Sequence, residues 1–351
     1  MAKYVAYVGT YTHANSVGIH VYDVDVENGI LTERSVTPIN NPSYLTISDN
    51  GKYLYSIADE GVAAFSIDKN GDLTKMNQEW IGGMRGCHVE VDSQNRYLFV
   101  AGYHDGRVTM MKLNPDGSIG PIADGIFHQG GFISASEKRL DHPKVTCVTM
   151  TPDQKYLCAV DFGLNHTKVY EVDYEHGKLK LEDIIRSNLD AGARIIRFSS
   201  DGRFAYIMTG EENTMEVYSY ELLKDGTDPE FNLIQTVDLS DEKLRNAAAT
   251  CFRFSSDESH VFATIDAING YSVLKRNAKD GTLTYEGTTM VSGDYPKALD
   301  VLPGDKYIVV LNHDTNEIRT FEHNYEGGFG LMKNAPITID KPNCIRIHRL
   351  D

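Results

Sequence analysis

Histidine, arginine, lysine and carboxylate side chains recur in this chain at the ends of short apolar segments. They stand just before one kind of segment, as His88 and Arg194 do, or just after another, as Asp161 does. Gathered in one concave site, such side chains can transfer protons and bind anions, and a site of this kind is the first candidate for catalysis. Whether they gather depends on the elements that carry them.

A pattern of two apolar segments separated by a polar turn recurs seven times along the chain. Residues 43–57 show it, with Leu45-Thr46-Ile47 before the turn and Tyr53–Ile57 after it. A third apolar segment follows, and in several copies an Asp-Gly or Asn-Gly turn such as Asn70-Gly71 precedes a weaker fourth. A strand-rich repeat of about 40 to 50 residues is typical of propeller blades. We therefore predict four-stranded antiparallel blades.

The two ends of the chain complement each other. Residues 4–9 form a second-type segment with no first segment before it, whereas residues 342–347 form a first-type segment that resembles residues 42–47. We therefore predict an all-β fold, a seven-bladed β-propeller whose first blade is closed by the C-terminal strand, as a single domain over residues 1–351. A β-sandwich, the alternative, explains neither the repeat nor the split copy.

Composition excludes several classes of partner. The chain has 34 Lys and Arg against 50 Asp and Glu, a formal net charge of −16, which argues against binding to nucleic acid or an anionic membrane. No apolar run approaches the roughly 20 residues of a membrane span, and the chain enters a strand directly after Met1-Ala2-Lys3. We expect no signal peptide and a cytoplasmic location. The 5 cysteines lack paired spacing and fit a reducing compartment, with Cys147 and Cys158 as small core residues.

In a propeller, the start of the first strand and the end of the second strand of each blade meet at one end. The repeat therefore predicts a funnel mouth that collects polar side chains from every blade. First-strand starts supply His88, His142, Lys144, Arg194, Thr250, Lys297 and Asn343, and second-strand ends supply Glu60, Tyr103, Asp161, Glu211, Asp266 and His313.

Each of these residues also has a plainer explanation as a turn former, a structural histidine or a solvated group. Arg194 stands out because it heads the apolar pair Ile195-Ile196, where a guanidinium needs an anionic partner. No spacing among the acids marks a metal site, so we predict no metal and no obligatory cofactor. The long stretch around residues 125–132 is either a lid over the funnel or a surface excursion.

The chain resembles a known family in motifs spread over essentially its whole length. These are Tyr7–Thr12 with Gly18-Ile19, Asn41–Leu45, Gly61–Phe65, Cys87-His88, Tyr156–Gly163 and Gly192-Ala193-Arg194. They resemble the seven-bladed lactonase family, which includes the propeller type of 6-phosphogluconolactonase and the fungal carboxy-muconate cyclase. The resemblance implies a hydrolase acting on a small-molecule substrate, a sugar-acid lactone or a related carboxylate.

The chain departs from the family pattern where the family's site lies. Lys144 replaces the second His of a Pro-His-x-His stretch, Ile195 replaces the His after the Arg, Glu211 lies one place later than the family's Glu, and Asp266 stands where the family has a second Arg. His142 and Arg194 are kept. Exchanging a cation for Asp266 should weaken binding of a doubly anionic phosphosugar lactone, and Lys144 restores one positive charge.

Lactone hydrolysis needs a base to activate water and a cation to hold the oxyanion. On the resemblance, His142 or His88 is the base, Arg194 with Lys144 stabilises the oxyanion, and Asp161 or Glu60 orients a cation or histidine. Two alternatives stay open. One is a divergent enzyme on another small carbohydrate or carboxylate, and the other is a non-catalytic ligand-binding or scaffold propeller. We expect a monomer or a weak homo-oligomer.

Overall fold

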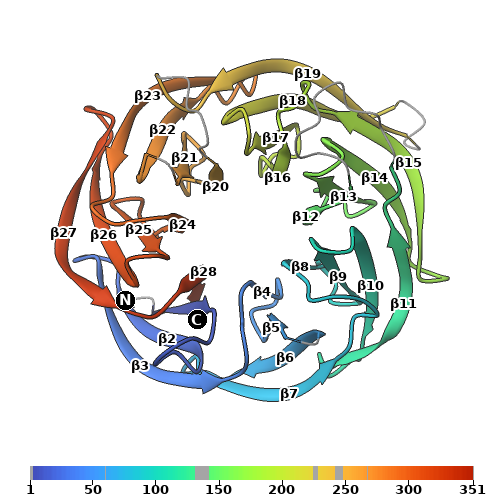
Figure 1. The fold of residues 1–351 in the computed structure, drawn as a ribbon, viewed down its shortest axis with the longest axis horizontal. Coiled ribbons are helices and arrows are strands. Elements are labelled where there is room, and N and C mark those ends of the chain that lie inside the picture. Colours follow the sequence, from blue (N-terminus) through green and yellow to red (C-terminus); the bar gives the residue numbers. More distant parts are fainter. Residues whose placement is uncertain are drawn as a thin grey trace. The chain divides into compact units, whose positions relative to one another are not determined.

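The computed structural model describes residues 3–59, 61–130, 142–223, 228–241, 248–266 and 268–350. Within these ranges the strands form seven four-stranded antiparallel sheets, the blades of the predicted seven-bladed β-propeller (Figure 1). The C-terminal strand β28 (Pro342–Arg349) pairs with β1 (Tyr4–Thr10), so the predicted closure of the first blade is confirmed. None of the described residues forms a helix long and apolar enough to span a membrane.

The chain divides into two compact units, and the first comprises residues 1–45, 67–74 and 237–351. It contains three complete sheets. Their remaining strands are β2 (Gly18–Asp25) and β3 (Ile30–Pro38); β20 (Ala249–Phe254), β21 (His260–Ile265), β22 (Gly270–Arg276) and β23 (Leu283–Met290); and β24 (Pro296–Val301), β25 (Tyr307–Asn312), β26 (Glu317–Asn324) and β27 (Phe329–Thr338).

The second unit comprises residues 46–66 and 75–236. It holds most of the sheet made by β4 (Leu45–Ile47), β5 (Tyr53–Ala58), β6 (Gly61–Ile67) and β7 (Leu73–Glu79). Its other sheets consist of β8 (His88–Val91), β9 (Tyr97–Gly102), β10 (Arg107–Leu113) and β11 (Ile119–Phe127); β12 (Val145–Met150), β13 (Tyr156–Asp161), β14 (His166–Asp173) and β15 (Lys178–Arg186); and β16 (Ala193–Phe198), β17 (Phe204–Thr209), β18 (Thr214–Leu222) and β19 (Pro229–Asp238).

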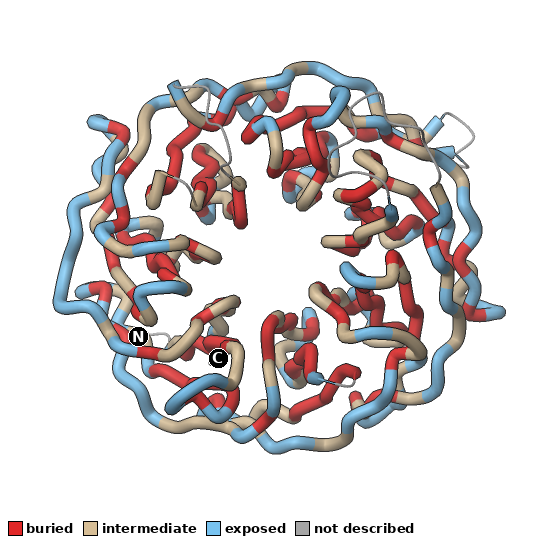
Figure 2. Tube along the Cα trace, in the orientation of Figure 1, coloured by how far each residue is buried: buried red, intermediate tan, exposed pale blue. Residues whose placement is uncertain are grey.

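The second strand of a blade is almost entirely buried and mostly apolar because it is covered on both faces. In β13, Leu157 and Ala159 pack in a cluster with Phe99 of β9, whereas the alternating Cys158 and Val160 pack in another with residues of β16 and β17. The fourth strands, such as β27, are mostly exposed (Figure 2). All 5 cysteines are free, and Cys158 is fully buried, as predicted for core residues.

The polar turn between first and second strands has a repeated hydrogen-bond arrangement. The hydroxyls of Thr151, Ser199 and Ser255 each donate to the carboxylate two residues later, at 2.6–2.7 Å. Each hydroxyl also accepts a backbone N–H from the residue five positions later, which begins or directly precedes the second strand. A side chain that satisfies local backbone groups in this way favours a turn over continued strand.

His323 predicts an acid-sensitive step in the stability of the first unit. The residue is 6% exposed, and neither ring nitrogen has a hydrogen-bond partner among the described residues. Burial beside Phe262 and Tyr325, with nearby His260, lowers the pKa of His323 to about 4. An unfolded histidine has a pKa of about 6.5. The stability that the neutral, buried ring contributes is therefore complete above pH 6.5. It is lost as the pH falls towards 4, and the free energy of unfolding drops by up to about 3 kcal/mol.

Urea denaturation at pH 7 and pH 4.5 measures this effect. The His323→Leu variant should lose less unfolding free energy than the wild type between these two pH values, because it has no buried imidazole to protonate. Equal losses in both proteins would contradict the prediction.

Candidate active site

The segment that carries His142 and Lys144 is attached to the turn after β13. The Lys144 N–H donates to Oδ1 of Asp161 at 2.9 Å, and its carbonyl accepts the N–H of Phe162 at 2.9 Å. Gly163 permits this approach, because a Cβ at that position would overlap the carbonyl oxygen of His142. His142 is exposed and Lys144 is half-buried. Both side chains are therefore positioned by backbone contacts to a rigid hairpin.

Arg194 lies beside the same turn. A Cβ at Gly210 would lie 3.4 Å from Cδ and 3.5 Å from Nη1 of Arg194, and 3.3 Å from Cε2 of Phe162. A Cβ at Gly192 would lie 2.8 Å from the same Phe162 atom and 2.9 Å from Cγ of Glu211. The structure thus brings Arg194 and Glu211 together around Phe162, which is bound to Lys144. Five predicted site residues, His142, Lys144, Asp161, Arg194 and Glu211, form one connected set in the second unit.

A β-bulge determines how Arg194 is presented. The register between β16 and β17 shifts between Ala193 and Ile195, so Arg194 is the extra residue. The register of β12 shifts in the same way around Thr146, whose hydroxyl donates to the Arg194 carbonyl at 2.7 Å. Bulges change the direction of a side chain and occur often beside active sites. Thr250 and Lys297 of the first unit lie at equivalent bulges.

The guanidinium of Arg194 has no carboxylate partner among the described residues, although the chain carries 50 acidic side chains. The side chain is half-buried. A partly desolvated cation without a counterion favours binding of an anion. This agrees with the expectation that Arg194 contacts a ligand.

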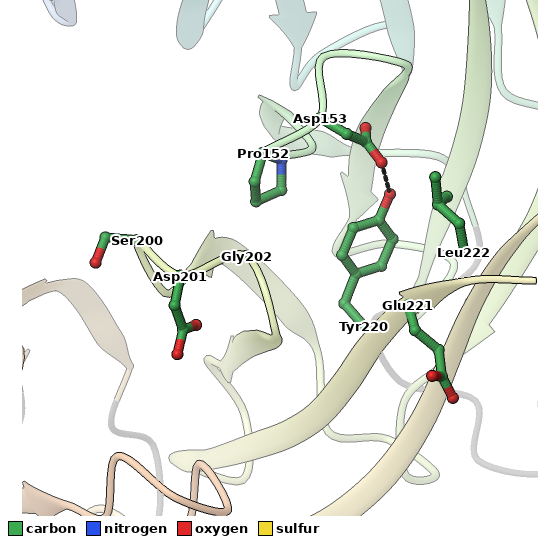
Figure 3. A pocket seen from close by; sticks show the side chains of 8 residues that line it. All are labelled: Pro152, Asp153, Ser200, Asp201, Gly202, Tyr220, Glu221 and Leu222. Carbon is green, nitrogen blue, oxygen red and sulfur yellow. Dashed lines mark hydrogen bonds between the residues drawn. The ribbon is translucent and has the colours of Figure 1, made fainter. Parts of the chain in front are cut away.

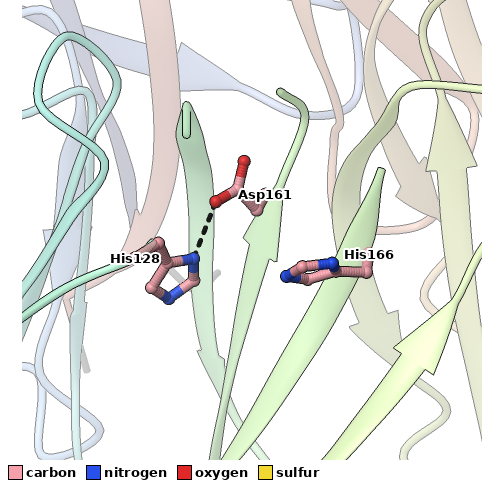
Figure 4. Close-up of side chains that lie close together, drawn as sticks. All are labelled: His128, Asp161 and His166. Carbon is pink, nitrogen blue, oxygen red and sulfur yellow. Dashed lines mark hydrogen bonds and ion pairs between the residues drawn. The ribbon is translucent and has the colours of Figure 1, made fainter. Parts of the chain in front are cut away.

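Asp161 is the buried member of this set and belongs to a hydrogen-bond network with His128 (Figure 4). Its Oδ1 accepts the N–H groups of Lys144 and Leu164, and its Oδ2 accepts from Nδ1 of His128 at 2.7 Å. The side chains of both Asp161 and His128 are 0% exposed. Burial acts to raise the pKa of Asp161, but the hydrogen bonds from His128 and Lys144 outweigh it and hold the pKa below its usual value. Asp161 is thus placed to orient Lys144 rather than to reach a substrate.

His128 is neutral and its tautomer follows from its partners. Burial lowers the pKa of His128 despite the neighbouring carboxylate. Since the ionised Asp161 can only accept, Nδ1 carries the proton and Nε2 accepts from the Tyr170 hydroxyl at 3.0 Å. His166 faces this pair across the hairpin, opposite Asp161 in the register of β13 and β14.

Two further predicted residues of the second unit, His88 and Tyr103, contact side chains outside this set. His88 is 5% exposed, with Nε2 3.6 Å from Sγ of Cys147. Tyr103 is exposed and packs edge-on against His104 at 5.4 Å between ring centroids. Glu60 lies outside the described residues. His88 as the base therefore has less geometric support than His142.

In the first unit, Lys297 and His313 share a contact with Tyr295. The Lys297 ammonium donates to the Tyr295 hydroxyl at 3.0 Å, and the Tyr295 and His313 rings meet edge-on at 5.5 Å. Burial lowers the pKa of His313. The Asp266 carboxylate accepts the N–H of Ala248 across the pair of strands β20 and β21.

The stretch proposed as a lid or surface excursion is partly regular structure. Gly125–Phe127 is the end of β11, so that part is a blade strand and not a loop. Residues 128–130 follow this strand, and residues 131–141 lie outside the described residues.

A pocket of about 360 Å³ lies away from the predicted residues (Figure 3). It is lined by Pro152, Asp153, Ser200, Asp201, Gly202, Tyr220, Glu221 and Leu222. Asp153 accepts from the Tyr220 hydroxyl at 2.7 Å, and Asp201 binds Arg203 at 2.7 Å. Two of its three carboxylates are thus occupied by internal donors.

Sequence reasoning missed His128, His166 and Tyr170. His128 follows a fourth strand and His166 begins a third strand, whereas the predicted funnel contained only residues at first-strand starts and second-strand ends. The short connection between β13 and β14 was a usable signal, because it places the first residue of β14 opposite Asp161.

Comparison with known proteins identifies the fold family. The family model described as "Lactonase, 7-bladed beta-propeller" matches residues 5–347. The chain belongs to this family. It is 30% identical to a 6-phosphogluconolactonase of Bacillus subtilis over 353 aligned residues, covering 99% of each chain.

Solved structures agree with this family membership. A Lactobacillus plantarum protein has a TM-score of 0.87 at 25% identity, with 99% of each chain covered. The periplasmic gluconolactonase of Pseudomonas aeruginosa has a TM-score of 0.92 at 24% identity, with 100% of each chain covered, and shows the shared fold. Because the fold occurs in a periplasmic protein, the cytoplasmic location of this lactonase-family chain stays a prediction.

Proposed function

We propose that this lactonase-family protein hydrolyses the lactone of a sugar acid, as the name of its Bacillus subtilis relative suggests. The observation that carries the proposal is the half-buried Arg194. It has no carboxylate partner in the part of the chain that the structure describes, and it is connected through Phe162 to the segment that presents His142 and Lys144. Two cations beside an exposed histidine suit a reaction in which negative charge develops on a carbonyl oxygen.

In the proposed mechanism His142 acts as the base. It takes a proton from water as the water oxygen attacks the lactone carbonyl carbon. The carbonyl oxygen becomes an oxyanion, which Arg194 and Lys144 stabilise. The ring C–O bond then breaks, the departing alkoxide receives the proton from His142, and the product is an open-chain hydroxy acid.

The electrostatics also bear on the substrate. In the proposed binding mode, Arg194 and Lys144 lie beside the carbonyl oxygen, so they attract both the oxyanion and the carboxylate of the product. Asp161 supports this arrangement indirectly, because its Oδ1 holds the Lys144 N–H. Asp266 stands where the family has a second Arg, so we expect weaker binding of a phosphorylated lactone than of its unphosphorylated counterpart.

Hydrolysis of 6-phosphogluconolactone and of gluconolactone, each compared with its spontaneous rate, tests the proposal. We expect acceleration of at least one lactone, with the lower KM for gluconolactone. Saturable binding of either lactone without any acceleration would contradict it and would favour the non-catalytic alternative. The absence of both binding and acceleration would favour a different small carbohydrate or carboxylate substrate.

A further inference from the structure

His128, Asp161 and His166 form a buried cluster whose members each present one ligand atom within 4.8 Å of the other two. Figure 4 shows the imidazole of His166 directed towards Asp161 and His128. His166 is 6% exposed, and its Nε2 is buried with no hydrogen-bond partner among the described residues. A buried nitrogen without a partner is costly, and this one points towards a carboxylate and a second imidazole.

The donor set has a defined chemical preference. Two imidazole nitrogens and one carboxylate oxygen suit first-row transition ions such as Zn²⁺, whereas Mg²⁺ and Ca²⁺ prefer all-oxygen sites. Burial lowers the pKa of His166 to about 4 and also lowers that of His128, while Asp161 is held ionised. At neutral pH both histidines are therefore in the neutral form that binds metals.

We propose that His128, Asp161 and His166 bind one divalent transition-metal ion in a buried structural site. The ligands come from the segment after β11, the end of β13 and the start of β14, so the ion connects two blades of the second unit. Zn²⁺ ligands lie about 2.0–2.2 Å from the metal, which places two ligands of a tetrahedral site about 3.4 Å apart. The ligand atoms of His128 and Asp161, now 2.7 Å apart, must therefore separate slightly, and any pair near the 4.8 Å limit must come closer.

The hydrogen bonds around His128 allow this change without loss of a proton. In the absence of metal, Nδ1 donates to Asp161 and Nε2 accepts from Tyr170. When Nδ1 binds the ion, the imidazole proton lies on Nε2, and the Tyr170 hydroxyl rotates to accept it. A ligating histidine whose second nitrogen donates to a fixed partner is the usual supporting arrangement of metal sites.

The site's burial keeps the ion out of contact with solvent and determines how the ion must enter. Since the His128 and Asp161 side chains are 0% exposed, we expect the ion to bind during folding and to exchange slowly afterwards. The whole chain should therefore be unfolded in guanidinium chloride with EDTA and refolded with or without Zn²⁺. A second sample is purified from cells grown with added Zn²⁺, so that poor refolding does not decide the result.

Metal content per chain and Tm are measured for the wild type, His166→Leu and His176→Ala. His166→Leu removes one ligand but leaves the bonds among His128, Asp161 and Tyr170 in place. His176→Ala is the matched control, because His176 forms an exposed pair with Asp173 at 2.8 Å in the same unit. We expect one tightly held Zn²⁺ and a higher Tm in the wild type and in the control, and at least tenfold weaker retention in His166→Leu.

Two outcomes would overturn the proposal. One is wild-type protein that retains no Zn²⁺ from either preparation, and the other is equal retention by the wild type and His166→Leu. Co²⁺ loading provides a direct second readout: visible d–d absorption that disappears in His166→Leu supports the site, and identical spectra contradict it. Lactone hydrolysis is not part of either readout, so the result is independent of the proposed function.

Discussion

Replacement of Arg194 by alanine should lower kcat for lactone hydrolysis by about 100- to 1000-fold, the usual effect of removing one oxyanion-stabilising donor. The side chain is half-buried and lies against Gly210, and no carboxylate of the described residues pairs with it. Because the substitution breaks no ion pair with a described residue, the thermal stability should change little. Steady-state kinetics and a thermal melt on the same preparation measure both effects.

Two further variants make this prediction specific. Arg194→Lys keeps the charge but loses the planar fork, so it should recover only part of the activity. Arg203→Ala removes an exposed arginine that pairs with Asp201 at 2.7 Å in the same unit and should leave kcat and KM unchanged. Full activity in Arg194→Ala, or an equal loss in Arg203→Ala, would remove Arg194 from the mechanism.

Replacement of Asp161 by alanine should reduce the free energy of unfolding by about 3–5 kcal/mol, the range for breaking a buried charged network. The substitution leaves Nδ1 of His128 and the N–H groups of Lys144 and Leu164 without their acceptor. Urea denaturation with EDTA present measures the loss without any contribution from a bound ion. Asp173→Ala is the control, because Asp173 ends β14 and pairs with the exposed His176, so its loss should reduce the free energy of unfolding far less than the loss of Asp161.

The pH dependence of this difference follows from the lowered pKa of Asp161. A carboxylate whose folded pKa lies below its unfolded value of about 3.9 contributes its full stability above that value. The contribution is lost as the pH falls through the folded pKa. The gap between wild type and Asp161→Ala should therefore remain open from pH 7 to pH 5, where the coupled His128 also titrates in the unfolded chain, and should close only below about pH 4. A gap that closes at pH 5 or above would contradict a lowered pKa.

The blade architecture could be predicted from the sequence because strand patterns and turn chemistry are local. Apolar runs such as Tyr156–Val160 and polar turns such as Thr151–Asp153 recur with every copy, and each specifies its conformation through near neighbours. The split copy at residues 4–9 and 342–347 predicted the pairing of β1 with β28, since an unmatched edge strand needs a partner.

The position of the candidate residues along the chain could likewise be predicted, but their grouping could not. Strand ends placed Arg194 and Lys144 at the same end of neighbouring blades. Only the tertiary structure showed that Arg194 lies on a β-bulge and that Phe162 connects it to Lys144. A bulge depends on the register between two strands, and register has no signature in a single strand.

Burial separated residues that look equivalent in the sequence. His88 and His142 both precede or begin a first strand, yet His88 is 5% exposed beside Cys147, whereas His142 is exposed. Asp161 and Glu211 stand at or just after the end of a second strand, but Asp161 is buried in a hydrogen-bond network with His128. His128 and His166 are 38 positions apart in the sequence, and no local pattern connects them. The sequence by itself thus determined the blades and their ionisable ends, and the packing of one blade against the next decided which of those side chains stay accessible and which are buried with one another.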